Sequence, residues 1–329
     1  MKTRRGFWLI VLLAASCARE EAPIAEVPGF NVDAGRITAS GVSSGAMMAT
    51  QLHVAHSSLV DGVALLAGGP YYCAEASLRK GLGPCMKGGD VGLPDIVGYA
   101  RDAAERGAID DLANLADDPV WLFRSNNDIV MHADTTAAAG DFYAEVAGVA
   151  PIAVTDVAAP HGFPTAYAGA ACTTMAEPWV YACGYDAAGE LLSALYGDLQ
   201  PRGEAGAEMI ELPQPGAADA TMLTHALAYV PAACEAGESC GVHVAFHGCQ
   251  QSTDYVGDAF AAKAGYNEWA ETNRLIVLYP QVGSSKIAPM NPMGCWDWWG
   301  YTDDDYATRA GRQIRVVKAT LDLLAGETL

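Results

Sequence analysis

The sequence predicts an α/β fold, in which helices cover both faces of a mostly parallel central sheet and disulfides stabilise the whole. Short apolar runs of the kind that form strands buried on both faces alternate with segments of helical periodicity. Hydrophobic residues make up 51% of the 329 residues and charged residues 18%, which supplies a large core and excludes a disordered chain. Beyond residue 17 the cysteines are even in number, as expected of a disulfide-bonded chain.

The charge balance excludes one class of function. Asp and Glu number 39 against 19 Lys and Arg, a formal charge of −20. A protein that binds nucleic acid needs a basic surface, and this composition supplies none. We therefore expect no nucleic-acid partner, and we expect a soluble, acidic protein that acts as a monomer.

The first 32 residues are expected to lie outside the fold. Residues 1–16 have the form of a signal peptide of the lipoprotein type, in which three basic residues precede an apolar run too short to span a bilayer. Ala14-Ala15-Ser16-Cys17 resembles a lipoprotein cleavage motif, after which lipid on Cys17 would attach the protein to a membrane. Plain secretory cleavage near Cys17 is the alternative. Residues 17–32 are expected to be a tether, and the protein is expected to be exported, as a periplasmic or outer-membrane lipoprotein or to the outside of the cell.

Export agrees with the use of cysteine, because disulfides form in oxidising compartments. Sequence spacing favours three local loops, and it leaves two cysteines for a fourth bond, among the 105 pairings that eight cysteines allow. No Cys-x-x-Cys pair is present, so we expect neither a metal site nor a cofactor. The expected pairs are Cys73–Cys85, Cys172–Cys183, Cys234–Cys240 and Cys249–Cys295.

The predicted elements begin with a strand over 36–40, which leads into a segment, 46–56, with apolar residues at helical spacing. The segment 198–220 is rich in Gly, Pro and Ala. It is interpreted as a surface connection inside one domain, so that residues 33–329 form a single domain. Further strand-like runs end at glycine, proline, histidine or polar residues, and they cover 63–67, 120–123, 150–157, 242–246 and 275–279.

Gly41-Val42-Ser43-Ser44-Gly45 stands between the first predicted strand and the first predicted helix. In this setting the Gly-x-Ser-x-Gly pattern is typical of a sharp turn that exposes a nucleophilic serine above a sheet. The glycines are needed because the turn is strained and its flanks pack closely. Ser43 is therefore the candidate nucleophile.

An activated serine needs a base, and the base needs an acid that fixes its tautomer. Asp128 and His161 each follow a predicted strand, where an α/β sheet presents its reactive groups. The chain order Ser, Asp, His is that of α/β-hydrolases. His132 is the alternative base and Asp118 or Asp134 the alternative acid. The remaining histidines are expected to pack on a helix or inside strands, and they include His53, His56, His225 and His243.

The mechanism also needs an anion site for the tetrahedral intermediate. One amide should come from Ser44, the residue after the nucleophile, and a second from a His-Gly loop. Such a loop is present as His247-Gly248-Cys249-Gln250, but it lies some 200 residues after the serine instead of before it. The order is restored if the chain is circularly permuted, which nearby termini make physically easy. The predicted fold is then a circularly permuted α/β-hydrolase.

These motifs together resemble the catalytic domain of extracellular short-chain-length poly(3-hydroxyalkanoate) depolymerases, in their permuted, type 2 arrangement. The resemblance covers residues 35–310. Its most discriminating part is a tryptophan cluster that is rare by composition, Gly294-Cys295-Trp296-Asp297-Trp298-Trp299. The other matching pieces are the serine motif, Asn127-Asp128, Pro160-His161-Gly162-Phe163-Pro164, His247-Gly248-Cys249-Gln250-Gln251, Tyr279-Pro280-Gln281 and Asn291-Pro292.

The resemblance implies a serine esterase that acts on a polyester or oligoester of the poly(3-hydroxybutyrate) type through an acyl-enzyme. It implies that Ser43 is the nucleophile, Asp128 the acid and His161 the base. The amides of Ser44 and Cys249 would be the oxyanion donors. The resemblance also supports the Cys249–Cys295 bond, which would clamp the oxyanion loop to the wall of the substrate cleft.

The tryptophan cluster suits such a substrate, because a neutral, insoluble polyester must be recognised through apolar and aromatic contacts. Trp296, Trp298 and Trp299 are candidate substrate-binding residues. Core packing is the alternative for at least one of them, and Trp298 or Trp299 is favoured as the substrate-facing ring. Two other functions stay open: an exported esterase for small or aromatic, feruloyl-type esters, and a ligand-binding lipoprotein without catalysis.

Overall fold

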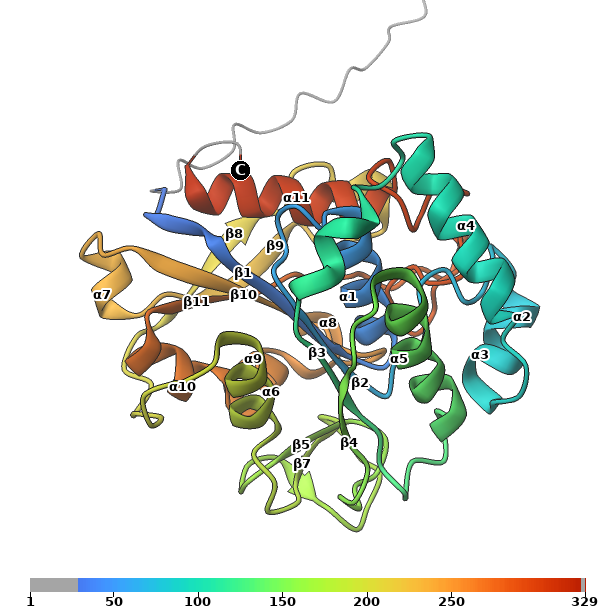
Figure 1. The fold of residues 1–329 in the computed structure, drawn as a ribbon. Coiled ribbons are helices and arrows are strands. Elements are labelled where there is room, and N and C mark those ends of the chain that lie inside the picture. Colours follow the sequence, from blue (N-terminus) through green and yellow to red (C-terminus); the bar gives the residue numbers. More distant parts are fainter. Residues whose placement is uncertain (1–28, 327–328) are drawn as a thin grey trace, which may run out of the picture.

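A single eight-stranded sheet runs through the part of the chain that the structure, a computed structural model, describes: residues 29–326 and 329 (Figure 1). Its strand order is β4-β3-β2-β1-β10-β11-β9-β8. The pairs from β4 to β11 are parallel, and β9 and β8 add an antiparallel extension. The strands are β1 (Val32–Val42), β2 (Val63–Leu66), β3 (Val120–Phe123), β4 (Ile152–Val154), β8 (Met209–Pro213), β9 (His225–Tyr229), β10 (Cys240–Phe246) and β11 (Leu275–Tyr279).

The predicted α/β fold with its mostly parallel sheet is confirmed, and two segments differ in detail. The run 150–157 forms only the short strand β4, which lies at the sheet edge beside β3, so that Ile152 is 52% exposed. The segment 198–220 is more than a surface connection, because it contains β8, which pairs with β9. A second small sheet, β5-β7-β6, follows β4 and consists of β5 (Phe163–Thr165), β6 (Ala170–Ala171) and β7 (Val180–Ala182).

Helices cover both faces of the large sheet, and each face has its own apolar core (Figure 1). One face is covered by α1 (Ser44–Ala55), α4 (Leu93–Glu105), α5 (Ala133–Ala147) and α11 (Arg312–Ala325). The other is covered by α6 (Ala187–Tyr196), α9 (Ala259–Lys263) and α10 (Tyr266–Asn273). Short helices in the connections are α2 (Leu78–Leu82), α3 (Pro84–Lys87), α7 (Ala232–Glu235), α8 (Thr253–Val256), η1 (Leu112–Asp117) and η2 (Ala217–Ala220).

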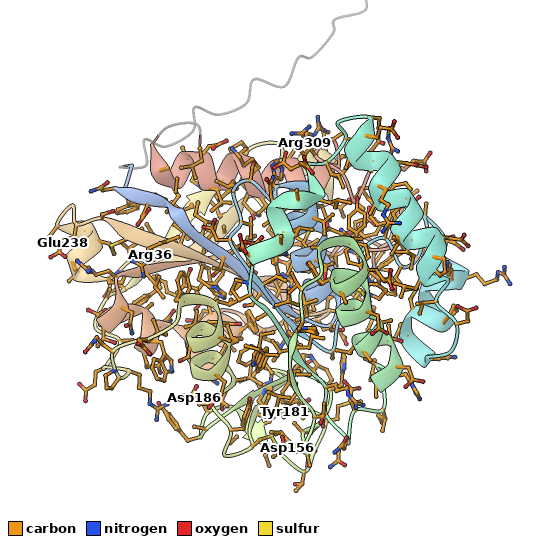
Figure 2. The ribbon with its side chains drawn as sticks, viewed as in Figure 1. Arg36, Asp156, Tyr181, Asp186, Glu238 and Arg309 are labelled. Atoms are coloured by element: carbon orange, nitrogen blue, oxygen red, sulfur yellow. A yellow bond between two sulfur atoms is a disulfide. The ribbon has the colours of Figure 1, made fainter. Side chains whose placement is uncertain are left out.

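The two ends of the described domain meet. The Phe30 N–H donates to Leu324 O at 2.8 Å, so the start of β1 lies against the end of α11. Arg309, labelled at the top of Figure 2, precedes α11 and forms an ion pair with Asp110 at 2.7 Å. The late part of the chain therefore packs against the early part, and β10 lies directly beside β1.

Four disulfides are present: Cys73–Cys85, Cys172–Cys183, Cys234–Cys240 and Cys249–Cys295. These are the pairs that the sequence spacing predicts, and their number fits an exported protein. Across residues 29–326, no helix is both long and apolar enough to cross a membrane. The predicted signal peptide 1–16, Cys17 and the tether up to residue 28 lie outside the described residues.

Candidate active site

Ser43 occupies a sharp turn between β1 and α1. Its backbone angles are φ 58° and ψ −122°, a conformation that side-chain-bearing residues rarely adopt. The Ser43 N–H donates to Leu66 O at 2.8 Å, which ties the turn to the end of β2. The side chain is thereby held above the carboxyl edge of the sheet, as the Gly-x-Ser-x-Gly pattern predicts.

Both glycines of the motif stand where no side chain fits. A Cβ on Gly41 would lie 2.2 Å from Gly45 O, and a Cβ on Gly45 would lie 2.4 Å from His247 O. The first contact closes the turn on itself. The second brings α1 against the end of β10, so the serine turn and the His-Gly loop are neighbours.

The structure brings Ser43, His161 and Asp128 together. His161 Nε2 lies 2.9 Å from Ser43 Oγ, and His161 Nδ1 lies 2.7 Å from Asp128 Oδ2. The other carboxylate oxygen, Oδ1, accepts from the Val130 and Met131 amides at 2.8 and 2.9 Å. Because the carboxylate accepts the Nδ1 proton, Nε2 is left as an acceptor that faces the serine hydroxyl.

The alternative acids and base lie elsewhere. His132 is half exposed, begins α5 and lies 3.4 Å from Asp134. Asp118 accepts from buried His53, whose Nδ1 lies 2.9 Å from Tyr143 OH. His53 is thus a packing residue. Neither His132 nor the Asp118–His53 pair lies in the cavity described below.

The loop after β10 lies beside the serine turn. A Cβ on Gly248 would be 3.5 Å from Ser43 Cβ. Neither the Ser44 N–H nor the Cys249 N–H donates to a protein acceptor within the described chain. The loop is held by the Cys249–Cys295 disulfide and by Gln251, whose Oε1 accepts from Gly248 N at 2.7 Å. Two amides that have no acceptor in the described chain therefore belong to residues that line the cavity together with Ser43, and an oxyanion site needs donors of this kind.

Trp296 and His247 support this loop from behind. The Trp296 Nε1–H donates to His247 O at 2.9 Å, and the two rings lie 5.4 Å apart. Because the Val282 amide donates to His247 Nε2, His247 must carry its proton on Nδ1, which donates to Gly248 O at 2.7 Å. Burial lowers the pKa of His247 to about 4, so the ring stays neutral.

This arrangement corrects the expectation for Trp296. The ring is fully buried, packs edge-on against Phe246 and does not line the cavity. Trp298 and Trp299 do line it, and their rings meet edge-to-face at 5.4 Å. Asp297, between Trp296 and Trp298 in the sequence, is a structural acceptor: its carboxylate accepts from three amides and the Thr302 hydroxyl. Burial raises the pKa of the Asp297 carboxyl.

A cavity of about 540 Å³ opens above Ser43 and His161. Its wall is mainly apolar. Besides Trp298 and Trp299 it includes residues that the sequence analysis does not single out. They are Trp179 on the base side, the α2–α3 segment with Leu78 and Leu82, and a set of thioethers from Met47, Met86, Met131, Met175, Met290 and Met293.

No local pattern in the sequence could have identified these wall residues. The six methionines come from five separate segments, because Met290 and Met293 share one loop, and only the fold collects them around one cavity. Methionine is unbranched and polarisable, so such a wall adapts to apolar ligands of varied shape. The site can therefore place an activated serine and two free amides at the floor of an apolar cavity.

Comparison with individual known proteins assigns the chain to a family. No family model matches the sequence. A poly(3-hydroxybutyrate) depolymerase of Delftia acidovorans is 37% identical over 312 residues, and a polyhydroxybutyrate depolymerase of Talaromyces funiculosus is 33% identical over 330 residues. The alignments cover 92% and 94% of this chain. The chain spans 62% of the length of the Delftia protein and 94% of that of the Talaromyces protein.

Two solved structures are similar over nearly their whole length. They are a PHB depolymerase from Penicillium funiculosum and a PHB depolymerase in complex with an R3HB trimer. Each has a TM-score of 0.85 and 30% sequence identity, and the match covers 91% of this chain and 98% of the solved chain. The chain belongs to the poly(3-hydroxybutyrate) depolymerase family.

Proposed function

We propose that the protein is a serine esterase that hydrolyses ester bonds of poly(3-hydroxybutyrate)-type short-chain polyesters or their oligomers. The observation that supports this best is the 2.9 Å contact between Ser43 Oγ and His161 Nε2 on the floor of an apolar cavity. Membership of the depolymerase family supports the same substrate class. The R3HB trimer bound to a solved relative supports a 3-hydroxybutyrate oligomer as the ligand.

The reaction proceeds through an acyl-enzyme. Ser43 Oγ attacks the ester carbonyl while His161 Nε2 accepts its proton, and Asp128 stabilises the imidazolium that forms. His161 then gives the proton to the departing alcohol oxygen. Water, activated by the same imidazole, releases the acyl group and restores the serine.

The tetrahedral intermediates need two donors for their negative oxygen. Among the described residues, the amides of Ser44 and Cys249 have no protein acceptor, and both residues line the cavity with Ser43, which supports this role. One donor of this kind is worth about 100- to 1,000-fold in kcat in serine hydrolases.

The rim of the cavity supports a neutral, apolar substrate. Leu78, Leu82, Met290 and Met293 are 45–63% exposed although they are apolar. Trp298 and Trp299 extend this surface into the cavity, and we propose them as substrate contacts. Exposed apolar groups gathered around one opening mark a binding surface.

We also propose that residues 33–329 are one catalytic domain and a circular permutant of the α/β-hydrolase fold. Both halves of the chain contribute strands to one sheet, and β10 with its His-Gly loop lies beside β1. We further propose that the protein is exported, that it is a monomer, and that it carries lipid on Cys17, which lies outside the described residues. The four disulfides support export.

The decisive test is clearing of amorphous poly(3-hydroxybutyrate) suspensions by the wild type and by Ser43→Ala. We expect the wild type to clear the suspension and to bind one fluorophosphonate per chain, and Ser43→Ala to do neither. Hydrolysis of ethyl ferulate by the wild type is measured alongside, as the comparison with a small aromatic ester. Turnover of ethyl ferulate without clearing would assign the protein to small aromatic esters, and clearing by Ser43→Ala would end the mechanism.

A further inference from the structure

The loops that hold Asp128 and His161 leave the sheet side by side. β3 and β4 pair up to Phe123 and Val154, and the Arg124 N–H still donates to Val154 O at 3.1 Å. Beyond this point no backbone-to-backbone hydrogen bond joins residues 125–131 to 155–162, both of which the structure describes. The acid and the base therefore stand on two loops that the sheet no longer holds together.

One side chain supplies the missing link. The Ser125 hydroxyl donates to Ala159 O at 2.5 Å and accepts from Ala159 N at 2.7 Å. It also accepts from the Asn127 amide at 3.0 Å. A hydroxyl has one proton and two lone pairs, so its whole hydrogen-bonding capacity is used. Ser125 thus binds both backbone polar groups of one residue, Ala159, as a neighbouring antiparallel strand would.

Both residues of this link lie close in the sequence to the acid or the base, so its loss would affect the positions of both. Ser125 stands three residues before Asp128, and Ala159 stands two residues before His161. Ser125 is 8% exposed and Ala159 is fully buried, so water has little access to the contact. Without the hydroxyl, the buried N–H and C=O of Ala159 would lose their partner.

The other contacts of the base loop lead away from the acid. The Tyr181 hydroxyl, labelled beside the small sheet in Figure 2, donates to His161 O at 3.3 Å. The Phe163 N–H donates to Trp179 O at 2.9 Å. These bonds fix the base loop to the small sheet. Only Ser125 and the Asp128–His161 pair itself connect it by hydrogen bonds to the acid loop among the described residues.

We propose that Ser125 is a positioning residue that sets the distance between Asp128 and His161, and this rests on the proposed function. The imidazole is held on one side by Asp128 and presents Nε2 to Ser43 on the other. A shift of 159–161 relative to 125–128 lengthens the Nδ1–Oδ2 contact, the Nε2–Oγ contact or both. A misplacement of about 1 Å in a reacting group costs about 100-fold in rate.

The test compares Ser125→Ala and Ser125→Thr in steady-state hydrolysis of p-nitrophenyl butyrate, a soluble ester. We expect Ser125→Ala to lower kcat about 10- to 100-fold with KM within about twofold, because Ser125 itself does not line the cavity. Ser125→Thr keeps the hydroxyl and should restore most of kcat. If Ser125→Ala does not fold, Ser125→Cys replaces it, since a thiol of similar size makes only weak hydrogen bonds.

The control is Ser57→Ala. Ser57 is 5% exposed, donates to Asp111 O at 3.1 Å and lies outside the cavity wall. Its loss removes that hydrogen bond and the one that Ser57 accepts from Asn114 Nδ2 at 3.4 Å, so a fall in Tm with unchanged kcat is expected. A Ser125→Ala kcat equal to that of Ser57→Ala would overturn the proposal.

A double-mutant cycle separates positioning from a general effect. In an Asp128→Asn background the acid–base contact is already impaired, so Ser125→Ala should lower kcat by less than about twofold further. The same factor in both backgrounds would contradict the proposal. If Asp128→Asn and Ser43→Ala themselves retained wild-type turnover, the proposed function would fail instead, which these two variants reveal independently of Ser125.

Discussion

At the residue scale, Ser43 has a strained backbone conformation that sets the position of its hydroxyl. A conformation of this kind at a residue with a side chain costs about 1–3 kcal/mol, and the surrounding packing has to offset it. The Leu66 hydrogen bond and the two close glycine contacts hold Ser43 in place. The strain lifts the hydroxyl off the sheet and leaves it 2.9 Å from His161.

The assignment of the base is testable at one side chain. We expect His161→Ala to lower kcat for p-nitrophenyl butyrate by about 1,000-fold or more, because a serine without its general base is a poor nucleophile. His132→Ala is the matched control. His132 caps α5 by accepting from the Asp134 amide at 3.3 Å and lies outside the cavity wall, so this variant should keep kcat within about twofold and lose about 1 kcal/mol of stability. The reverse pattern would reassign the base.

Among the elements, β10 and the loop that follows it link the two halves of the site. The strand lies between β1 and β11, and its loop ends at a disulfide that joins it to the tryptophan segment. The Cys249 amide is therefore held between a buried strand and a covalent bond. The direction of the Cys249 N–H therefore depends on both the strand and the disulfide.

Removal of Cys249–Cys295, as the double variant Cys249→Ser with Cys295→Ser, should lower kcat about 10- to 100-fold, because the oxyanion loop then lacks its anchor. The control removes Cys234–Cys240, which lies at the other end of β10. That variant should lose stability but keep kcat once folded. Steady-state kinetics at 25 °C, with Tm measured in parallel, checks both. Equal kcat losses would show that the first bond has only a structural role.

At the scale of the whole molecule, three histidines are held in neutral form: His243 and His247 are fully buried and His56 is half-buried. Burial lowers the pKa of His243 to about 3 and the pKa values of His56 and His247 to about 4, from an ordinary value of 6.5. His243 is linked to Thr38 and Ser40 by hydrogen bonds of 2.7 Å. The unfolded chain binds protons on these rings at a pH where the folded protein does not.

The fold should therefore lose stability in mild acid. The contribution of the three histidines to the free energy of unfolding is fully present above pH 6.5. It is lost as the pH drops toward 4, because their folded-state pKa values lie below the unfolded ones. At pH 5 each ring contributes a loss of about 2 kcal/mol. Urea unfolding between pH 7.5 and pH 5 measures it. His56→Gln should reduce the pH dependence and exposed His225→Gln should not; an unchanged free energy of unfolding at pH 5 would contradict the account.

The meeting of the ends of the domain predicts that the chain tolerates new termini. We expect a variant that joins Gly326 to Gly29 through a short Gly-Ser linker, and opens the chain between Ala205 and Gly206, to fold and hydrolyse p-nitrophenyl butyrate. The new order places β10 before β1, which is the unpermuted order under the circular-permutation proposal. Residues 204–206 are exposed and lie outside the strands and helices. Circular dichroism and kcat check the variant, and failure to fold would argue against the circular-permutation proposal.

Much of this architecture is predictable because its causes are local. The serine turn follows from two glycines and one serine within five residues, and the strands follow from continuous apolar runs. The small sheet is not predictable in this way, because its strands of two or three residues depend on pairing with each other. The edge position of β4 likewise depends on strand pairing, because β4 pairs with β3 alone in the described sheet.

The sequence by itself determined the serine turn, the parallel sheet, the disulfide pairs and the family. The tertiary structure alone decided that Trp296 is buried behind the His-Gly loop while Trp298 and Trp299 line the cavity, and that methionines from five distant segments surround it. It also decided that Ser125 links the two loops of the acid and the base. The reason is physical: a turn depends on neighbours in the chain, whereas a cavity wall depends on contacts between segments that no local pattern records.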